Sequence, residues 1–270
     1  MVPRMSISNK LGLLIDVAAT GLVVFGIAST AEYNQIDFVQ VEQVSDRVKE
    51  NSVYANIINY STNPTIEIRN RITCAHETTH MINAYLRNTL SSNEKNINAF
   101  YLPPGWGFVV EEPNIRKIQV SEFVPPNVRG YRYNTYITGA REWDKQPLYI
   151  IDEWCAYING ALVGIDDVNN GRYRSGWTDG VSGCLELSLY GVALCMAIER
   201  YDNNYWNENE QFRAFIKWNL QRAYNTYEIG KDYKEFKWKK QEEFLQKFRT
   251  SKETKDMRDF IADYFDGIGL

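Results

Sequence analysis

The run from Cys184 to Ile198 restricts the fold most, because it is apolar on almost every side of a helix. A helix without a polar face has to be surrounded by other elements, so we expect a buried central helix with the rest of the chain around it. The chain has 270 residues, of which 44% are hydrophobic, and this is enough material for a sizeable core. We find no repeat or linker that divides it. We therefore expect a single domain over 1–270, with or without a helical subdomain over 147–270.

Composition excludes several classes of protein. The apolar and aromatic contents of 44% and 14% exclude intrinsic disorder, and a formal net charge of −4 argues against a surface built for nucleic acid. We therefore expect no nucleic-acid partner. The cysteines are too few and too scattered for a disulfide framework, so we expect them to be small buried residues. They are Cys74, Cys155, Cys184 and Cys195.

The N-terminal segment 1–30 leaves localisation open between cytoplasmic and secreted. Two basic residues precede an apolar stretch at 11–28 that small residues follow, an arrangement typical of a secretory signal and nearly long enough for a membrane anchor. Asp16 lies inside this stretch and argues against both, because a carboxylate in hydrocarbon is costly. The third interpretation is a folded hairpin around a Thr-Gly turn. Membrane association stays open as well.

Apolar spacing predicts a mixed N-terminal half and a mainly helical C-terminal half. The short runs 38–41, 108–110 and 118–120 predict strands, and prolines at 103–104, 113 and 125–126 interrupt the chain around the last two. A polar loop is expected at 166–182. Helices are expected over 64–88, with Asn63-Pro64 at its start, and over 147–165, 184–198, 208–224, 232–249 and 252–265. The predicted fold class is therefore α+β.

Both histidines of the chain belong to one short motif, His76-Glu77-Thr78-Thr79-His80, inside the predicted helix 64–88. Positions four apart place the two imidazoles one turn apart on one face, where they can hold a single cation. Zinc suits such ligands and lowers the pKa of a bound water. Glu77 lies beside the two histidines and is the candidate to take a proton from that water.

The third ligand of a catalytic zinc site has to be a carboxylate or, as a weaker candidate, a cysteine, because no histidine remains. Glu153 shares a helical face with the small residues Ala156, Gly160 and Gly164, which would allow another helix to approach closely. Glu186 is the rival, because a carboxylate in the apolar run needs a partner. That partner is either the metal, a metal-bound histidine or a buried salt bridge.

The histidine motif and the segment Asp152-Glu153-Trp154-Cys155-Ala156 resemble the gluzincin branch of HExxH zinc metallopeptidases. The second segment is also similar to the second zinc helix of lethal-factor-like toxin peptidases. The resemblance implies a zincin-like fold, a Zn²⁺ ion bound by His76, His80 and Glu153, and a peptide or protein substrate. It also implies hydrolysis by metal-activated water with Glu77 as the general base.

The oxyanion of peptide hydrolysis needs a further donor, which has to be tyrosine or arginine because no histidine is left. Tyr149 and Tyr157 lie four residues before and after Glu153 on its helical face. Tyr149 is preferred because lethal-factor-like peptidases place a tyrosine shortly before the ligand glutamate, although the spacing differs here. The alternative function is a catalytically inactive zincin scaffold with a binding or structural role, against which the intact Glu77 argues.

Overall fold

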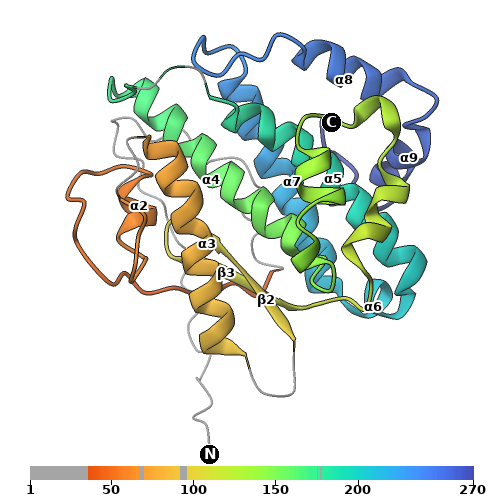
Figure 1. Ribbon diagram of the computed structural model, residues 1–270, viewed down its shortest axis with the longest axis horizontal. Coiled ribbons are helices and arrows are strands. Elements are labelled where there is room, and N and C mark those ends of the chain that lie inside the picture. The colour runs from red at the N-terminus through yellow and green to blue at the C-terminus, as the bar shows by residue number, and fades with distance from the viewer. Residues whose placement is uncertain (1–35, 67–69, 92–95, 175, 177) are drawn as a thin grey trace, which may run out of the picture.

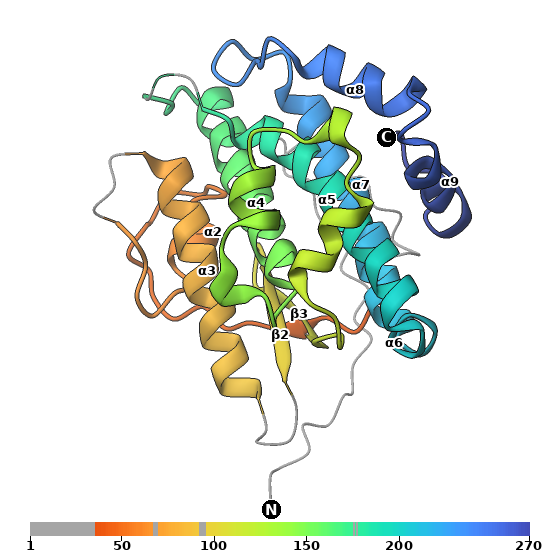
Figure 2. The same ribbon diagram turned by 45° about the vertical axis from the view of Figure 1, so that its right-hand side comes forward.

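The computed structural model describes residues 36–66, 70–91, 96–174, 176 and 178–270, so the expectations for 1–30 lie outside the described residues. The described chain forms one small sheet and a larger set of helices (Figures 1 and 2), which confirms the predicted α+β class. The strands are β1 (Val39–Gln40), β2 (Ile97–Leu102) and β3 (Trp106–Glu111). The α-helices are α2 (Ala55–Ile58), α3 (Arg71–Leu90), α4 (Tyr149–Asn169), α5 (Gly180–Tyr201), α6 (Asn203–Glu208), α7 (Glu210–Gly230), α8 (Gln241–Thr250) and α9 (Lys255–Tyr264). Four short helical segments join β3 to α4: the 3₁₀ turns η1 (Lys117–Phe123), η2 (Pro126–Val128) and η4 (Arg141–Trp143), and the π-helix η3 (Tyr133–Thr138).

The sheet is antiparallel, with the strand order β1-β3-β2. β2 and β3 form a hairpin in which Leu102 pairs with Trp106, so the three residues between them make the turn. Gly105 closes this turn with a φ of +72°, a conformation that glycine adopts without steric cost. The predicted strands at 38–41 and 108–110 are thereby confirmed in β1 and β3.

The helices form layers around α4, which lies beside α3 on one side and beside α5 and α7 on the other (Figures 1 and 2). β2 packs against both α3 and α4. Phe215 of α7 stacks on Phe108 and Phe100 of the sheet, with ring centroids 4.2 and 5.8 Å apart. α4 is therefore the element that the sheet and the helices share.

The predicted central helix is confirmed in α5, which is buried from Gly180 to Cys195. Two of its glycines receive aromatic rings from α4: a Cβ on Gly183 would lie 2.3 Å from the ring of Tyr157, and one on Gly191 would lie 2.8 Å from that of Trp154. α5 is long and apolar enough to cross a membrane, but 94% of its apolar window is buried within the protein, as in an ordinary core helix. The four cysteines are buried, as predicted.

The predicted start of the first long helix is wrong, because α3 begins at Arg71 and not at Asn63-Pro64. Asn70 caps the helix, and its side chain accepts a hydrogen bond from the backbone N–H of Ile72 at 3.0 Å. Either asparagine has the side chain that an N-cap requires.

The predicted strand at 118–120 is also wrong, because these residues belong to η1. Asp144 takes the backbone donors that a neighbouring strand would need: its carbonyl accepts from Lys117 N at 2.8 Å and its carboxylate from Ile118 N at 3.0 Å. The Lys117 ammonium then donates to the carbonyls of Tyr136, Ile137 and Gly139 at 2.6–2.9 Å. A buried cation therefore holds the C-terminal end of η3.

Several boundaries in the helical half also differ from the predictions; for example, the helix predicted over 208–224 continues to Gly230 in α7. The helix predicted over 232–249 begins only at Gln241, because Glu242 and Glu243 provide the acidic first turn that suits a helix N-terminus while lysines precede it. The loop predicted at 166–182 is shorter, since α4 continues to Asn169 and α5 starts at Gly180.

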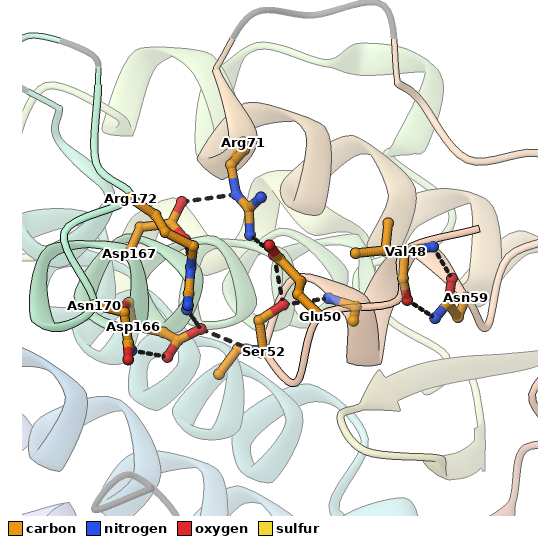
Figure 3. Close-up of polar contacts among 11 residues, drawn as sticks. Val48, Glu50, Ser52, Asn59, Arg71, Asp166, Asp167, Asn170 and Arg172 are labelled. Atoms are coloured by element: carbon orange, nitrogen blue, oxygen red, sulfur yellow. Dashed lines mark hydrogen bonds and ion pairs between the residues drawn. The ribbon is translucent and has the colours of Figure 1, made fainter. Parts of the chain in front are cut away.

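Ion pairs join the beginning of α3 to the end of α4 (Figure 3). Arg71 pairs with Glu50 and, at 2.8 Å, with Asp167 of α4. Arg172 pairs with Asp166 at 2.7 Å and with Asp167 at 3.2 Å. These contacts join the N-terminal end of α3 to the C-terminal end of α4, the end opposite to Asp152 and Glu153.

Candidate metal centre

The two histidines lie one turn apart on α3, as their spacing predicts. Their Nε2 atoms are 3.1 Å apart and their ring centroids 4.7 Å apart. The side chains of His76 and His80 are 16% and 23% exposed, so both rings reach the edge of the protein interior while remaining open to solvent. This arrangement allows both nitrogens to contact one small cation from the same side.

A close crossing of α3 and α4 brings the third acidic side chain to the histidines. A Cβ on Gly160 would lie 3.2 Å from the carbonyl oxygen of Ile72 and 3.7 Å from the Cβ of His76, and one on Gly164 would lie 2.7 Å from the side chain of Ile72. The prediction that the small residues of α4 admit another helix is thus confirmed, and that helix is α3.

Glu153 reaches the histidines from α4. Its Oε2 atom lies 3.5 Å from Nε2 of His76 and 3.6 Å from Nε2 of His80, and the three candidate ligand atoms lie within 4.8 Å of one another. Oε2 is buried and accepts no hydrogen bond from the described residues. Burial raises the pKa of this carboxyl, but its contacts with the two imidazoles outweigh burial and lower the pKa below its ordinary value. Glu153 is therefore an ionised carboxylate with an oxygen free to bind a cation.

Asp152, the neighbour of Glu153, holds the ring of His80 in place. Its Oδ1 lies 2.5 Å from His80 Nδ1, which turns Nε2 of that ring towards Glu153 and His76. A carboxylate on the far nitrogen is the usual way to orient a metal-ligating histidine. Burial lowers the pKa of His80, but Asp152 and Glu153 outweigh it and raise the pKa to about 10. A metal ion at this site would therefore displace a proton.

Glu77 is half-buried on α3, next to His76. Within the described part of the chain, its carboxylate forms no hydrogen bond or ion pair, in contrast to that of Asp152. A carboxylate without a fixed donor keeps its lone pairs available for a proton, as a general base requires.

Three tyrosines line the site on the side of α4. Tyr157 packs edge-on against the ring of His76, with centroids 4.8 Å apart, and its hydroxyl lies 3.2 Å from that of Tyr136. The ring of Tyr149 stacks on Trp143 and lies 6.3 Å from that of Tyr136. Burial and the negative charge of Glu153 raise the pKa values of both Tyr149 and Tyr136. All three tyrosines are therefore protonated hydroxyls that can donate a hydrogen bond.

Glu186, the rival third ligand, lies in a different cluster and does not meet the histidines. Its carboxylate accepts hydrogen bonds from the backbone N–H of Arg132 at 2.7 Å, the guanidinium of Arg132 at 2.8 Å and the hydroxyl of Tyr190 at 2.6 Å. The salt bridge that could explain a buried Glu186 is thus present, and this carboxylate has no need of a metal.

Sequence reasoning missed four residues near the site: Asn83, Arg87, Tyr136 and Asp152. The first two had a detectable signal, because they continue the spacing of the histidines along α3 as positions 76, 80, 83 and 87. Asp152 was noted only as part of the sequence pattern around Glu153, and no role of its own was predicted for it. Tyr136 had no signal, because it belongs to a π-helix that the sequence did not indicate.

The donors fit a metal cation. Two imidazole nitrogens and one carboxylate oxygen converge. The oxygen is buried and receives no hydrogen bond from the part of the chain that the structure describes, an arrangement that costs free energy unless a cation approaches it. The same three groups would accept several transition metals.

Comparison with known proteins identifies no relative, since no protein-family model, no curated protein and no solved structure matches the chain.

Proposed function

We propose that this protein is a zinc-dependent peptidase of the gluzincin type, built on a zincin-like fold, with His76, His80 and Glu153 as the metal ligands. The observation that carries the proposal is the buried Oε2 of Glu153, which faces both Nε2 atoms and has no hydrogen-bond donor among the described residues. The HExxH spacing on α3 and the orientation of His80 by Asp152 support the same proposal.

Zinc is the favoured ion because of the donor types. Calcium and magnesium prefer sites made of oxygen ligands, whereas two imidazoles with one carboxylate form a common set for catalytic zinc. Three protein ligands also leave a coordination position for water or substrate. When bound, zinc would act as a Lewis acid on the scissile carbonyl and lower the pKa of water.

The side chains around this position have complementary roles in hydrolysis of a peptide bond. Glu77 accepts the proton of the attacking water and passes it to the leaving amine. The hydroxyl of Tyr149, or of Tyr157, donates to the oxyanion that develops on the carbonyl oxygen. Asp152 keeps His80 in one orientation throughout, so that the site does not have to reorganise during the reaction.

The direct test is digestion of a peptide library by the zinc-saturated wild type and by Glu77→Gln, with the products identified by mass spectrometry. Glutamine has the shape of glutamate but cannot accept the proton, so we expect cleavage to slow by about 10²–10⁴-fold. Zinc content should stay near one ion per chain in both proteins. Glu208→Gln, at an exposed position of α6, is the matched control and should cleave at the wild-type rate.

Equal cleavage by the wild type and Glu77→Gln would contradict the role of Glu77. A wild type that binds zinc but cleaves nothing in the library would favour the alternative function, an inactive scaffold with a binding or structural role. A wild type that binds no zinc when purified with zinc present would contradict the metal site itself.

A further inference from the structure

The polar face of α3 continues beyond the histidines. Asn83 and Arg87 follow His80 at intervals of three and four residues, so they lie on the same face of the helix. Asn83 is fully buried and the side chain of Arg87 is 20% exposed. Buried polar groups on a helix facing a sheet and another helix need specific partners, which makes this face informative.

Both residues bind Asp152, the carboxylate that orients His80. Asn83 donates from Nδ2 to Oδ1 at 2.9 Å, and Arg87 donates from Nη1 to Oδ2 at 2.8 Å. Together with the contact of His80 to Oδ1, each oxygen of Asp152 is held by at least one group from α3. The carboxylate cannot rotate without breaking one of these contacts.

The two α3 residues are themselves tied to strand β2. The side-chain oxygen of Asn83 accepts from the backbone N–H of Tyr101 at 2.6 Å. Arg87 Nη1 also donates to Oδ1 of Asn98 at 3.0 Å, and Asn98 donates to Glu112 at 2.8 Å. A continuous chain of hydrogen bonds therefore runs from the sheet through α3 to Asp152 on α4 and ends at the ring of His80.

We propose that Arg87 is a positioning residue that sets the metal affinity of the site: by holding Oδ2 of Asp152 against α3 and β2, it keeps Oδ1 on Nδ1 of His80 and so keeps Nε2 directed at the metal position. The inference rests on the proposed metal site and extends it beyond the groups that touch the ion. Arginine suits the role because its planar guanidinium binds the Asp152 carboxylate and the Asn98 amide at the same time.

The direction of the change in metal affinity when Arg87 is replaced tests the inference, because a purely electrostatic role and a positioning role of Arg87 predict opposite changes. If the guanidinium acted only as a nearby positive charge, it would repel a cation, and its removal would tighten metal binding. If it positions Asp152, its removal frees the carboxylate and weakens metal binding. Losses in metal affinity of about 10–100-fold are typical when the partner of a ligating histidine is removed.

The experiment measures the zinc dissociation constant by chelator competition for the wild type, Arg87→Met and Arg87→Lys. We expect about a tenfold weaker affinity for Arg87→Met, with Arg87→Lys between it and the wild type. Arg71→Met is the matched control: Arg71 is also on α3 and also pairs with carboxylates, but these are Glu50 and Asp167, so the affinity should not change.

A second readout distinguishes positioning from general damage to the fold. Because the chain has two histidines, ¹⁵N-histidine labelling gives NMR signals from only two imidazoles. In metal-free Arg87→Met we expect the ring nitrogens of His80 to shift more than those of His76, whose ring contacts that of His80. Equal shifts of both rings, or none, would overturn the inference, and so would an unchanged or tighter zinc affinity.

Failure of the proposed function produces a different pattern of results. A wild type that binds no zinc overturns the metal site and this inference with it. A wild type that binds zinc but cleaves no peptide overturns only the peptidase, and weaker zinc binding by Arg87→Met would then still support the positioning role.

Discussion

Two buried glutamates, Glu153 on α4 and Glu186 on α5, lie in similar sequence surroundings, but the protein compensates their negative charges in different ways. Both are nearly inaccessible, at 6% and 2% exposure, and both lie in largely apolar helices. Three donors from Arg132 and Tyr190 satisfy Glu186. Glu153 instead faces two imidazoles and keeps one oxygen without a hydrogen bond.

The two carboxylates differ in whether the described residues supply the hydrogen-bond donors and the positive charge that a buried anion needs. Glu186 is neutralised by a guanidinium that belongs to the protein, so its cluster is complete and serves to hold the fold together. Glu153 has an acceptor oxygen without a hydrogen-bond donor among the described residues, and this oxygen faces two imidazoles, so under the proposed function a cation would complete its cluster. A carboxylate buried beside histidines but short of donors is therefore a stronger indication of a metal site than burial alone.

The largest effect is expected from Glu153→Gln. The amide keeps the shape of the side chain but removes the anionic ligand, so we expect zinc affinity to fall by at least about a hundredfold, more than the usual loss of an outer partner. Isothermal titration calorimetry with zinc checks this, with Glu186→Gln as the control that should retain wild-type affinity. Similar losses of zinc affinity in both variants would contradict the claim that Glu153, and not Glu186, is a metal ligand.

For the free energy of unfolding we expect the opposite order, with the larger loss in Glu186→Gln and the smaller in Glu153→Gln. Arg132 pairs with two carboxylates, and Glu186→Gln removes the charge of the buried one and leaves only Asp179, whose side chain is 40% exposed. Weakening the pairing of a buried charge is costly. We expect the free energy of unfolding to fall by roughly 2–4 kcal/mol in urea denaturation of the metal-free protein. Glu153→Gln should lose less, because His80, unlike the guanidinium of Arg132, can release its proton once the carboxylate is gone. A larger loss for Glu153→Gln would contradict this reasoning.

A third carboxylate, Glu112, is intermediate between Glu186 and Glu153, because it accepts hydrogen bonds but only from neutral donors. It accepts from Asn98 at 2.8 Å and from the backbone N–H of Leu148 at 3.1 Å. Burial raises its pKa to about 7, against the opposing effects of these donors and of Arg87, while Asp152 adds to the rise. The native protein therefore holds a proton on Glu112 at pH values where the unfolded chain has released it.

This difference predicts a stability that depends on pH. The stabilisation from the bound proton is complete below about pH 4.5 and is lost as the pH rises through about 7. Relative to Glu112→Gln, which does not titrate, the wild type should lose roughly 2–3 kcal/mol of unfolding free energy between about pH 5 and pH 8. Denaturation curves of both proteins across this range check the prediction, and a constant difference between them would contradict it.

Local patterns in the sequence were enough to predict the elements that carry the site. The spacing of the histidines placed them on one face of a helix, and the small residues after Glu153 correctly indicated a close helix crossing. The apolar run from Cys184 to Ile198 correctly indicated a central helix. These features depend on residues close together along the chain.

Features that depend on residues far apart in the chain could not be predicted from the sequence. The choice between Glu153 and Glu186 required knowing that Arg132, 54 residues away, pairs with Glu186. The segment 118–120 forms no strand because Asp144, farther along the chain, takes its backbone donors. Such contacts are decided by tertiary packing and leave no periodic signal.

The central claim is that His76, His80 and Glu153 bind one metal ion together. Anomalous X-ray diffraction at the zinc edge, from crystals grown with zinc, tests it most directly. The account predicts one peak about 2.0–2.2 Å from Nε2 of each histidine and from Oε2 of Glu153. No peak between the histidines, or a zinc ion there that Glu153 does not contact, would contradict it.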